Sequence, residues 1–158
     1  MANNVVDVEQ LFELYKTDVY RFALAITRDK YLSEDITQDV FLSLIRNANK
    51  VSDIKRIKSW LLTTTKNSSI SALRKRSFEV GEIDTSSFDI GKDIYQSEFF
   101  SMLDCLDEKD RQIVALHIVN RMRHREIAQI IGIKPGTVRQ RYVRSLKIIK
   151  QNLLEELK

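Results

Sequence analysis

The sequence has little of several residue types, and each shortage excludes a class of protein. Its 158 residues contain one cysteine, one proline and four glycines. One cysteine cannot form an internal disulfide, and so few glycines and prolines argue against an all-β sandwich or barrel with many tight turns. No apolar run approaches the length of a membrane-spanning helix, and the acidic N-terminal stretch is unlike a signal peptide. We therefore expect a cytoplasmic, mostly helical protein without membrane insertion.

Residues that carry metal or catalytic chemistry are also scarce. The two histidines, His117 and His124, fall on different predicted helices, and no CxxC or His-rich spacing typical of zinc accompanies them. Cys105 lies in an apolar segment, which predicts a buried thiol. No Ser/His/Asp arrangement and no glycine-rich phosphate loop is present in the sequence. The sequence therefore predicts no enzyme, no metal and no cofactor.

Charge divides the chain into three segments. The formal net charge is +4, made of +4 over residues 1–76, −5 over 77–100 and +5 over 101–158. The middle segment also holds two glycines and a run of Ser and Thr without sustained helical periodicity, as expected of a linker. This pattern predicts an all-α protein of two small helical domains joined by a flexible acidic linker. Two basic units suit a polyanion contacted at two places, although charge alone fits two solvated surfaces equally well.

Apolar spacing in the first unit predicts a long helix over 8–26, followed by a second helix capped by Ser33. The second helix places Ile36, Val40 and Leu44 on one side. Its opposite side carries four residues that form a face of acids and an amide around a leucine: Asp35, Gln38, Asp39 and Leu42. Such a face is usually solvated surface, but it also suits a partner that presents arginines.

A polar stretch over 47–56 predicts a loop, and a third helix is expected from Ile57 to Leu73, ending in the basic triplet of 74–76. Trp60 is expected in the core. Basic residues lie around this loop and along the start of the helix: Lys55, Arg56, Lys58 and Lys66. A surface of this kind can hold a nucleic-acid single strand by charge, with pockets for splayed bases.

The C-terminal unit contains a helix-turn-helix pattern. Asp107 is a candidate N-cap for a helix, and after the polar break at 120–123 a short helix and a long basic helix follow. Ala128, Gly132 and Val138 have the spacing A-x3-G-x5-V, in which a small residue, a left-handed turn and an apolar plug bring two helices together. Pro135 suits the first turn of the second helix. Motif and charge together favour DNA binding over a bare helical hairpin.

The long helix has two sides. Val138, Tyr142, Ser145 and Ile149 step by three or four residues and should face inward. The N-terminal residues of a recognition helix contact base edges, which Arg and Gln side chains suit. The residues expected to face outward are Thr137, Arg139, Gln140, Val143, Arg144 and Lys147. The Arg and Gln side chains suit base contacts, and phosphate contacts are expected from Lys134, Thr137, Arg141 and Lys147.

On these motifs the chain resembles the extracytoplasmic-function (ECF) class of bacterial RNA polymerase sigma factors. The first unit is similar to sigma region 2, most specifically in the E-D-x-x-Q-D-x-F string that begins at Glu34, and in W-L with Asn67 seven residues after Trp60. The second unit, LDEKDRQIVALHIVNRMRHREIAQIIGIKPGTVRQRYVRSLKIIK, is similar to region 4. The resemblance covers nearly everything outside the linker.

The resemblance implies a role for each segment. Residues 1–76 would bind core polymerase and melt the −10 element, 77–100 would be the acidic linker, and 101–158 would recognise the −35 element. The acidic face would bind the clamp helices of the β′ subunit, and region 4 would contact the β flap. The melted −10 strand would be held by Asn49, Lys50, Ser52, Asp53, Lys55, Arg56, Lys66 and Asn67. The −35 element would be contacted by the eight residues of the long helix named above.

Partners and alternatives follow from the same resemblance. Core RNA polymerase and promoter DNA are the expected partners. Control is expected either from a separate anti-sigma factor or through the expression of the protein itself. Ser71, Thr64–Thr65 and Gln140 depart from the family's usual residues, so the promoter sequence does not follow from the motif. A stand-alone helix-turn-helix regulator would normally dimerise, and an adaptor would use its helices for protein contacts alone. The acidic face, the basic loop and the arginine-rich helix favour the sigma factor over both.

Overall fold

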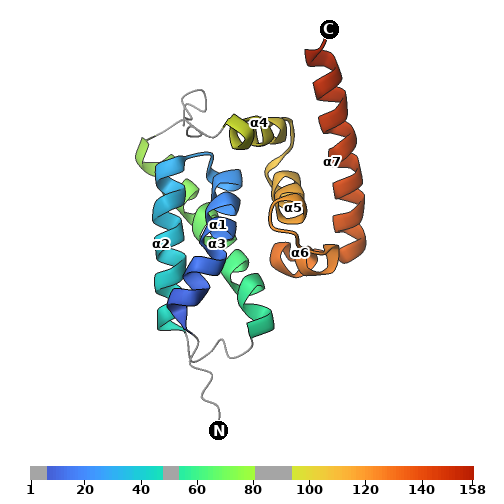
Figure 1. Cartoon of the computed structure of the whole chain (residues 1–158). Helices are drawn as coiled ribbons and strands as arrows, with labels where there is room; N and C mark the ends of the chain where they lie inside the picture. Colours follow the sequence, from blue (N-terminus) through green and yellow to red (C-terminus); the bar gives the residue numbers. More distant parts are fainter. Residues whose placement is uncertain (1–6, 48–53, 81–93) are drawn as a thin grey trace.

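The computed structural model describes residues 7–47, 54–80 and 94–158, and every regular element within these ranges is helical. The elements are α1 (Val8–Thr27), α2 (Lys30–Arg46), α3 (Ile54–Val80), α4 (Ile94–Met102), the 3-10 turn η2 (Leu103–Cys105), α5 (Glu108–Ile118), α6 (His124–Ile131) and α7 (Pro135–Glu156). Helices α1–α3 form an N-terminal unit, and α4–α7 form a C-terminal unit beside it (Figure 1). The predicted all-α, two-domain fold is confirmed.

The start of α2 differs from the prediction. The N-cap is Asp29, whose side chain accepts from the backbone N–H groups of Tyr31 and Leu32 at 3.0 and 3.1 Å. Ser33 lies within the helix, fully buried, and its hydroxyl is 2.8 Å from the Thr27 hydroxyl. Both Asp29 and Ser33 are good N-cap residues by type, and the earlier one is used because α1 ends at Thr27 with Arg28 as its C-cap. The short connection sets α2 against α1.

The N-terminal unit has its own apolar core. The buried residues from its three helices are Leu11, Val19, Ala23, Ile36, Val40, Phe41, Leu44, Ile57 and Leu61. Ile36, Val40 and Leu44 are buried as their spacing predicted, and Trp60 packs against this core while half-buried. The burial leaves the opposite side of α2 facing solvent.

Two segments predicted to lack helix are partly helical. Helix α3 begins at Ile54 rather than Ile57 and continues to Val80, past the basic triplet. Arg76 of that triplet forms an ion pair with the α2 cap, Asp29. Helix α4 begins within the expected linker and ends two residues beyond it, and Phe100 near its end is buried. The short apolar stretch of α4 gave no sustained periodicity, but packing of Phe100 stabilises it.

The C-terminal unit has the predicted helix-turn-helix. Asp107 caps α5 and accepts from the backbone N–H of Asp110 at 2.8 Å. Gly132 ends α6 at φ 82°, a left-handed conformation that favours glycine. Pro135 lies in the first turn of α7. Ala128 and Val138 are buried, as the spacing predicted.

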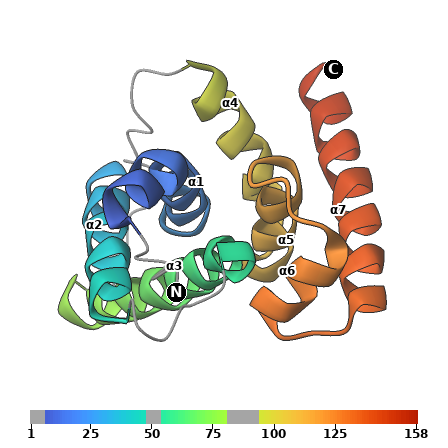
Figure 2. The same cartoon turned by 60° about the horizontal axis from the view of Figure 1, so that its bottom comes forward.

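The two units share a second core, which the sequence did not predict. On α1, Phe22, Ala25 and Ile26 belong to one buried cluster with residues of α5, α6 and α7, and Leu62 of α3 joins it. Helix α1 packs against α5, and α3 packs against α6 (Figure 2). A helix with apolar residues on two sides needs a partner on each. The C-terminal unit therefore covers the side of α1 that faces away from α2.

Candidate nucleic-acid and protein interfaces

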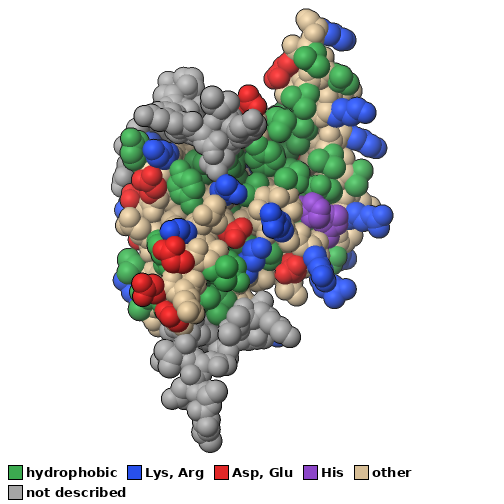
Figure 3. Space-filling view, viewed as in Figure 1, with side chains coloured by type: hydrophobic (Ala, Val, Ile, Leu, Met, Phe, Trp, Pro, Cys, Tyr) green, Lys and Arg blue, Asp and Glu red, His purple; other side chains and the backbone are tan. Residues whose placement is uncertain are grey.

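The N-terminal half of α7 presents a basic surface to solvent. Basic side chains line the outer edge of this helix (Figure 3). Five exposed residues form what we call the recognition face: Arg139, Gln140, Val143, Arg144 and Lys147. They line a shallow groove together with Gly136. The orientation agrees with the prediction for these five, and Lys134 is also exposed, whereas Thr137 is half-buried.

Asp110 of α5 holds the recognition helix, and sequence reasoning missed it. Its carboxylate is buried and accepts from Arg141 Nη1 at 3.0 Å and from Arg144 Nη2 at 3.1 Å. Arg141 also lies 3.9 Å from the Asp107 carboxylate and is half-buried. These charge-assisted bonds fix the rotation of α7 relative to α5. An acid three residues after a helix cap gives no sequence signal for this role.

Three rings meet where α5, α6 and α7 converge. His117 and His124 have ring centroids 4.8 Å apart, and Tyr142 lies 4.6 Å from His117 and 5.3 Å from His124. His117 Nδ1 is 3.0 Å from the Met122 carbonyl oxygen, while His124 Nε2 is buried without a protein partner. Burial, then the neighbouring His117 and Arg139, lowers the pKa of His124. The uncharged ring therefore suits this packing.

On the N-terminal unit, the acidic face of α2 is open to solvent. Asp35, Gln38 and Asp39 are exposed, and the Leu42 side chain is 48% exposed. An exposed leucine among carboxylates provides an apolar contact surrounded by charge. These four predicted residues therefore share one exposed side of α2. Helix α2 itself lies on the side of the N-terminal unit remote from α5–α7 (Figure 1).

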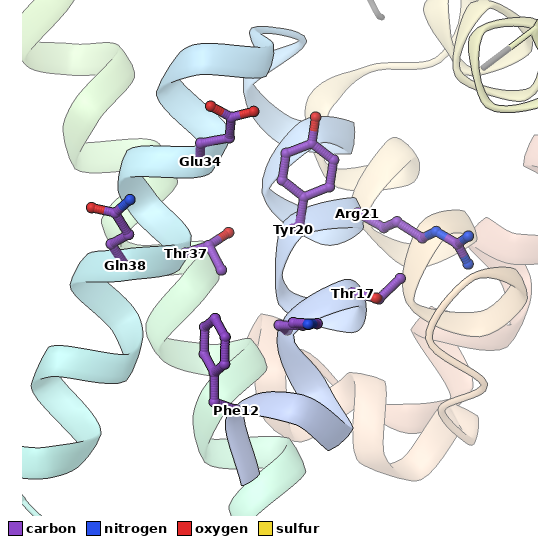
Figure 4. A pocket seen from close by; sticks show the side chains of 8 residues that line it. Phe12, Thr17, Tyr20, Arg21, Glu34, Thr37 and Gln38 are labelled. Atoms are coloured by element: carbon purple, nitrogen blue, oxygen red, sulfur yellow. The ribbon is translucent and has the colours of Figure 1, made fainter. Parts of the chain in front are cut away.

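A shallow pocket of about 360 Å³ lies beside this face, between α1 and α2. Phe12 and Tyr20 of α1 and Thr37 of α2 line it, with Glu34 and Gln38 on the α2 side (Figure 4). Burial, then the charge of Glu34, raises the pKa of Tyr20. The pocket continues the acidic face, because Gln38 belongs to both.

The residues predicted to hold a melted strand are only partly described. Asn49, Lys50, Ser52 and Asp53, like the side chain of Lys55, lie outside the described residues. Arg56, near the start of α3, and Asn67, near its middle, are exposed. Lys66 is half-buried, and its ammonium donates to the Ile130 carbonyl oxygen of α6 at 2.6 Å. Burial, then the charge of Lys109, lowers the pKa of Lys66.

The remaining sequence predictions concern Cys105, metal binding and membrane insertion. Cys105 is half-buried rather than buried, and its thiol donates to the Met102 carbonyl oxygen at 3.3 Å. Within 7–47, 54–80 and 94–158, no three His, Cys, Asp or Glu side chains gather as metal ligands. In the same ranges, no helix combines the length and the apolar character needed to cross a membrane.

Comparison with known proteins agrees with this architecture. Residues 11–79 match the family Sigma-70 region 2, and residues 97–149 match Sigma-70, region 4. The ECF RNA polymerase sigma factor SigM of Bacillus subtilis is 24% identical over 90% of this chain and 93% of its own length. The ECF RNA polymerase sigma factor SigL of Mycobacterium tuberculosis is 29% identical over 90% and 88%.

Solved structures show the same fold. The sigma factor RpoE of Bartonella quintana, in complex with the anti-sigma factor NepR, superposes with a TM-score of 0.77 at 23% identity, over 93% of this chain and 96% of RpoE. CnrH, in complex with the cytosolic domain of CnrY, superposes with a TM-score of 0.74 at 18% identity, over 96% and 90%.

A region 2 unit followed by a region 4 helix-turn-helix defines a sigma-70-type transcription initiation factor. Within that class, the chain belongs to the ECF sigma factors.

Proposed function

We propose that this protein is an alternative sigma factor that binds core RNA polymerase through α2, directs it to specific promoters, and divides promoter recognition between α3 and α7. The observation that carries the proposal is the separation of two surfaces of opposite charge. The acidic face lies on α2 of one unit, and the basic recognition face lies on α7 of the other. A DNA-binding module alone has no use for the first surface.

The acidic face would bind the clamp helices of the β′ subunit. Asp35 and Asp39 are one helical turn apart and exposed, so both can pair with arginines on one partner helix. Leu42 adds apolar contact area, and Gln38 a hydrogen-bonding amide. The β flap would contact the C-terminal unit.

The recognition face would contact the −35 element in the major groove. Arg139 and Gln140 are exposed near the start of α7, where a recognition helix meets base edges. Arg144 keeps 59% of its side chain exposed although one nitrogen bonds Asp110, so it has donors left for a base. Lys134, Thr137, Arg141 and Lys147 would contact phosphates.

The −10 strand would be held by α3 and the segment before it. Arg56 and Asn67 are exposed on α3, and Lys66 lies beside Asn67 in sequence. The segment with Asn49, Lys50, Ser52, Asp53 and Lys55 would complete the site. The domain assignment follows: residues 1–76 for polymerase and −10 contacts, 77–100 as linker, and 101–158 for −35 contacts.

A sigma factor of this kind acts in the cytoplasm, where RNA polymerase transcribes, and needs no catalytic group or cofactor of its own. An anti-sigma factor would be a further partner, because RpoE of Bartonella quintana is solved in complex with the anti-sigma factor NepR, and CnrH is solved in complex with the cytosolic domain of CnrY. The stand-alone dimeric regulator is not favoured, since it leaves region 2 without a role.

The test combines binding and activity. Purified protein and purified core polymerase should co-elute, and the holoenzyme should give specific run-off transcripts from a genomic promoter library that core alone does not transcribe. A protein that binds duplex DNA as a dimer and ignores core polymerase would overturn the proposal in favour of the regulator.

A further inference from the structure

The C-terminal half of α7 carries an apolar stripe that stays exposed. Val143, Leu146, Lys150, Leu153 and Leu157 follow one another at alternating steps of three and four residues, the spacing of a coiled-coil seam. The four apolar members are all exposed, and Leu157 is 84% exposed. Hydrophobic side chains are visible along this part of α7 on the side toward α4 (Figure 3). Single exposed leucines are ordinary, whereas a continuous apolar stripe indicates a surface for another protein chain.

A groove of about 430 Å³ lies beside this stripe, between α4 and α7. Its apolar lining comes from both helices and consists of Phe99, Met102, Ile149 and Leu153. Glu98 and Glu156 also line the groove and are exposed, so its edge is acidic. Leu153 belongs to both the stripe and the groove. The groove therefore suits an apolar side chain that has a cation next to it.

Helix α7 itself carries a group of this kind. Leu146 is exposed, and Lys150, one helical turn later, is exposed as well. The same helix thus presents an apolar residue with a cation and, about two turns further on, an apolar groove with carboxylates. A surface that contains both halves of a contact is self-complementary, because two copies related by a two-fold axis can each fill the groove of the other.

The charges on the stripe favour an antiparallel pair. In a parallel pair in register, Lys150 of one copy would face Lys150 of the other, which is unfavourable. In an antiparallel pair, Leu146 can lie opposite Leu157 of the second copy. Lys150 then lies opposite Leu153, and Glu156 follows Leu153 by about one turn, so the ammonium and the carboxylate can pair. The two-fold axis makes every such contact twice.

The contact is short, so the pairing should be weak. Leu146 to Leu157 spans about 17 Å at about 1.5 Å per residue. Stable dimers bury about 1,600 Å² in total, and two helices in contact over this length bury less. We expect a dissociation constant of about 10 to 100 µM. An association of this strength is reversible and gives way to a tighter partner.

We propose that the stripe and groove of α7 form a self-association surface on which two copies of this chain pair in antiparallel orientation, and that this pair competes with −35 DNA for the end of the recognition face. Val143 belongs to the stripe and Lys147 lies at its edge, and both belong to the recognition face. The competition rests on the proposed function, whereas the pairing does not. DNA should therefore dissociate this dimer, unlike the dimer of a stand-alone regulator, which DNA stabilises.

The first experiment measures the mass of the full chain by sedimentation between about 5 and 200 µM. The wild type should change from monomer to dimer over this range. Lys150→Glu should raise the dissociation constant about tenfold or more, because two carboxylates then meet in each half of the contact. Lys150→Glu with Glu156→Lys restores opposite charges and should restore pairing. Lys75→Glu makes the same charge change on an exposed residue of α3 and is the matched control.

Disulfide formation tests the orientation. The background is Cys105→Ser, which keeps a donor for the Met102 carbonyl oxygen. Leu146→Cys and Leu157→Cys are made in separate chains, mixed and oxidised. The mixture should give at least about five times more cross-linked dimer than either variant alone. In the antiparallel pair the two copies of one position lie about 17 Å apart along the helices, which is too far for a disulfide.

A wild type that stays monomeric up to about 200 µM would overturn the pairing. A dimer that Lys150→Glu leaves unchanged would place the contact elsewhere, and efficient cross-linking of either cysteine variant alone would overturn the antiparallel orientation. Random-sequence duplex DNA of about 20 base pairs should raise the apparent dissociation constant of the dimer at least about fivefold. An unchanged constant would overturn the competition.

The groove has one other candidate occupant, core polymerase. If the wild type is monomeric and Leu153→Ser weakens its co-elution with core polymerase, the groove binds polymerase and the self-association is wrong. Co-elution of the wild type with core polymerase tests the proposed function separately. A chain that pairs as described but does not bind core polymerase would overturn the proposed function and leave the self-association in place.

Discussion

The two basic surfaces of this protein differ in access, although both are proposed to bind the same promoter. On α7, Arg139 and Lys147 are exposed and held in place from behind by bonds between Asp110 and neighbouring arginines. On α3, Lys66 is half-buried and bonded to a carbonyl of α6. The comparison teaches that a positive charge count does not identify an available DNA surface. A basic side chain that is already bonded to another group of the protein is less available to contact DNA.

The largest effect is expected at the acidic face of α2, which is exposed to solvent. Asp35→Lys with Asp39→Lys should weaken core polymerase binding by about 100-fold or more, because like charges would then meet across the interface. The helical circular dichroism should not change, since both side chains are exposed. Pull-down with core polymerase measures the loss.

The control is Glu155→Lys with Glu156→Lys, which makes the same charge change on exposed residues of α7. Normal affinity of the α2 variant would remove the assignment of the acidic face.

The second prediction concerns the ion pairs of Asp110 that hold the recognition helix in place. Asp110→Ala leaves Arg141 and Arg144 without their shared acceptor, and should lower the free energy of unfolding by about 1–3 kcal/mol. Binding of the holoenzyme to −35 duplex DNA should weaken as well, because α7 loses its fixed rotation. Chemical denaturation and duplex binding measure the two effects. A fall in stability with unchanged DNA affinity would mean that Asp110 supports the fold alone.

The third prediction separates base contacts from phosphate contacts within the recognition face. Arg139→Ala should lose about tenfold or more in discrimination at one or two base pairs of the −35 element. Lys147→Ala should instead weaken binding evenly on all sequences and lower the salt slope by about one unit. A promoter library assayed with holoenzyme at two salt concentrations distinguishes them. If Arg139→Ala shifts only the overall affinity, its side chain is oriented to phosphate.

The smallest effect concerns the rings behind the recognition face. Since the folded state lowers the pKa of His124 below its usual 6.5, the unfolded chain binds the proton more readily. Stability should therefore be complete above about pH 6.5 and fall as the pH drops below it, until the folded protein is protonated too. His124→Phe should flatten this slope. Denaturation midpoints between about pH 5 and 8 provide the test, and an unchanged slope would assign it to other groups.

Much of the fold could be predicted from local patterns. The spacing of Ala128, Gly132 and Val138 gave the helix-turn-helix, because close packing and a left-handed turn allow few residue types. The apolar steps of α1 and α2 gave the first core. The start of α2 was placed wrongly at Ser33, since two good caps lay within five residues and the end of α1 decided between them.

The arrangement of the two units could not be predicted in the same way. Phe22, Ala25 and Ile26 mark a second apolar side of α1, but periodicity does not say what covers it. Lys58 and Lys66 were assigned to a nucleic-acid surface by charge, and their carbonyl partners lie 62 and 64 residues away in sequence. Pairings over such separations depend on tertiary packing. Asp110 was missed for the same reason.

Helix α1 belongs to two cores at once, with Val19 and Ala23 in one and Phe22 and Ala25 in the other. Both cores need α1, so melting one of them removes support from the other. The chain should therefore unfold in one cooperative heat-absorption peak. Separation of the units would expose one side of α1 and divide that peak in two, with the C-terminal helices melting independently of the first three. Calorimetry thus reports the coupling of the units as a number of transitions, without any DNA or polymerase present.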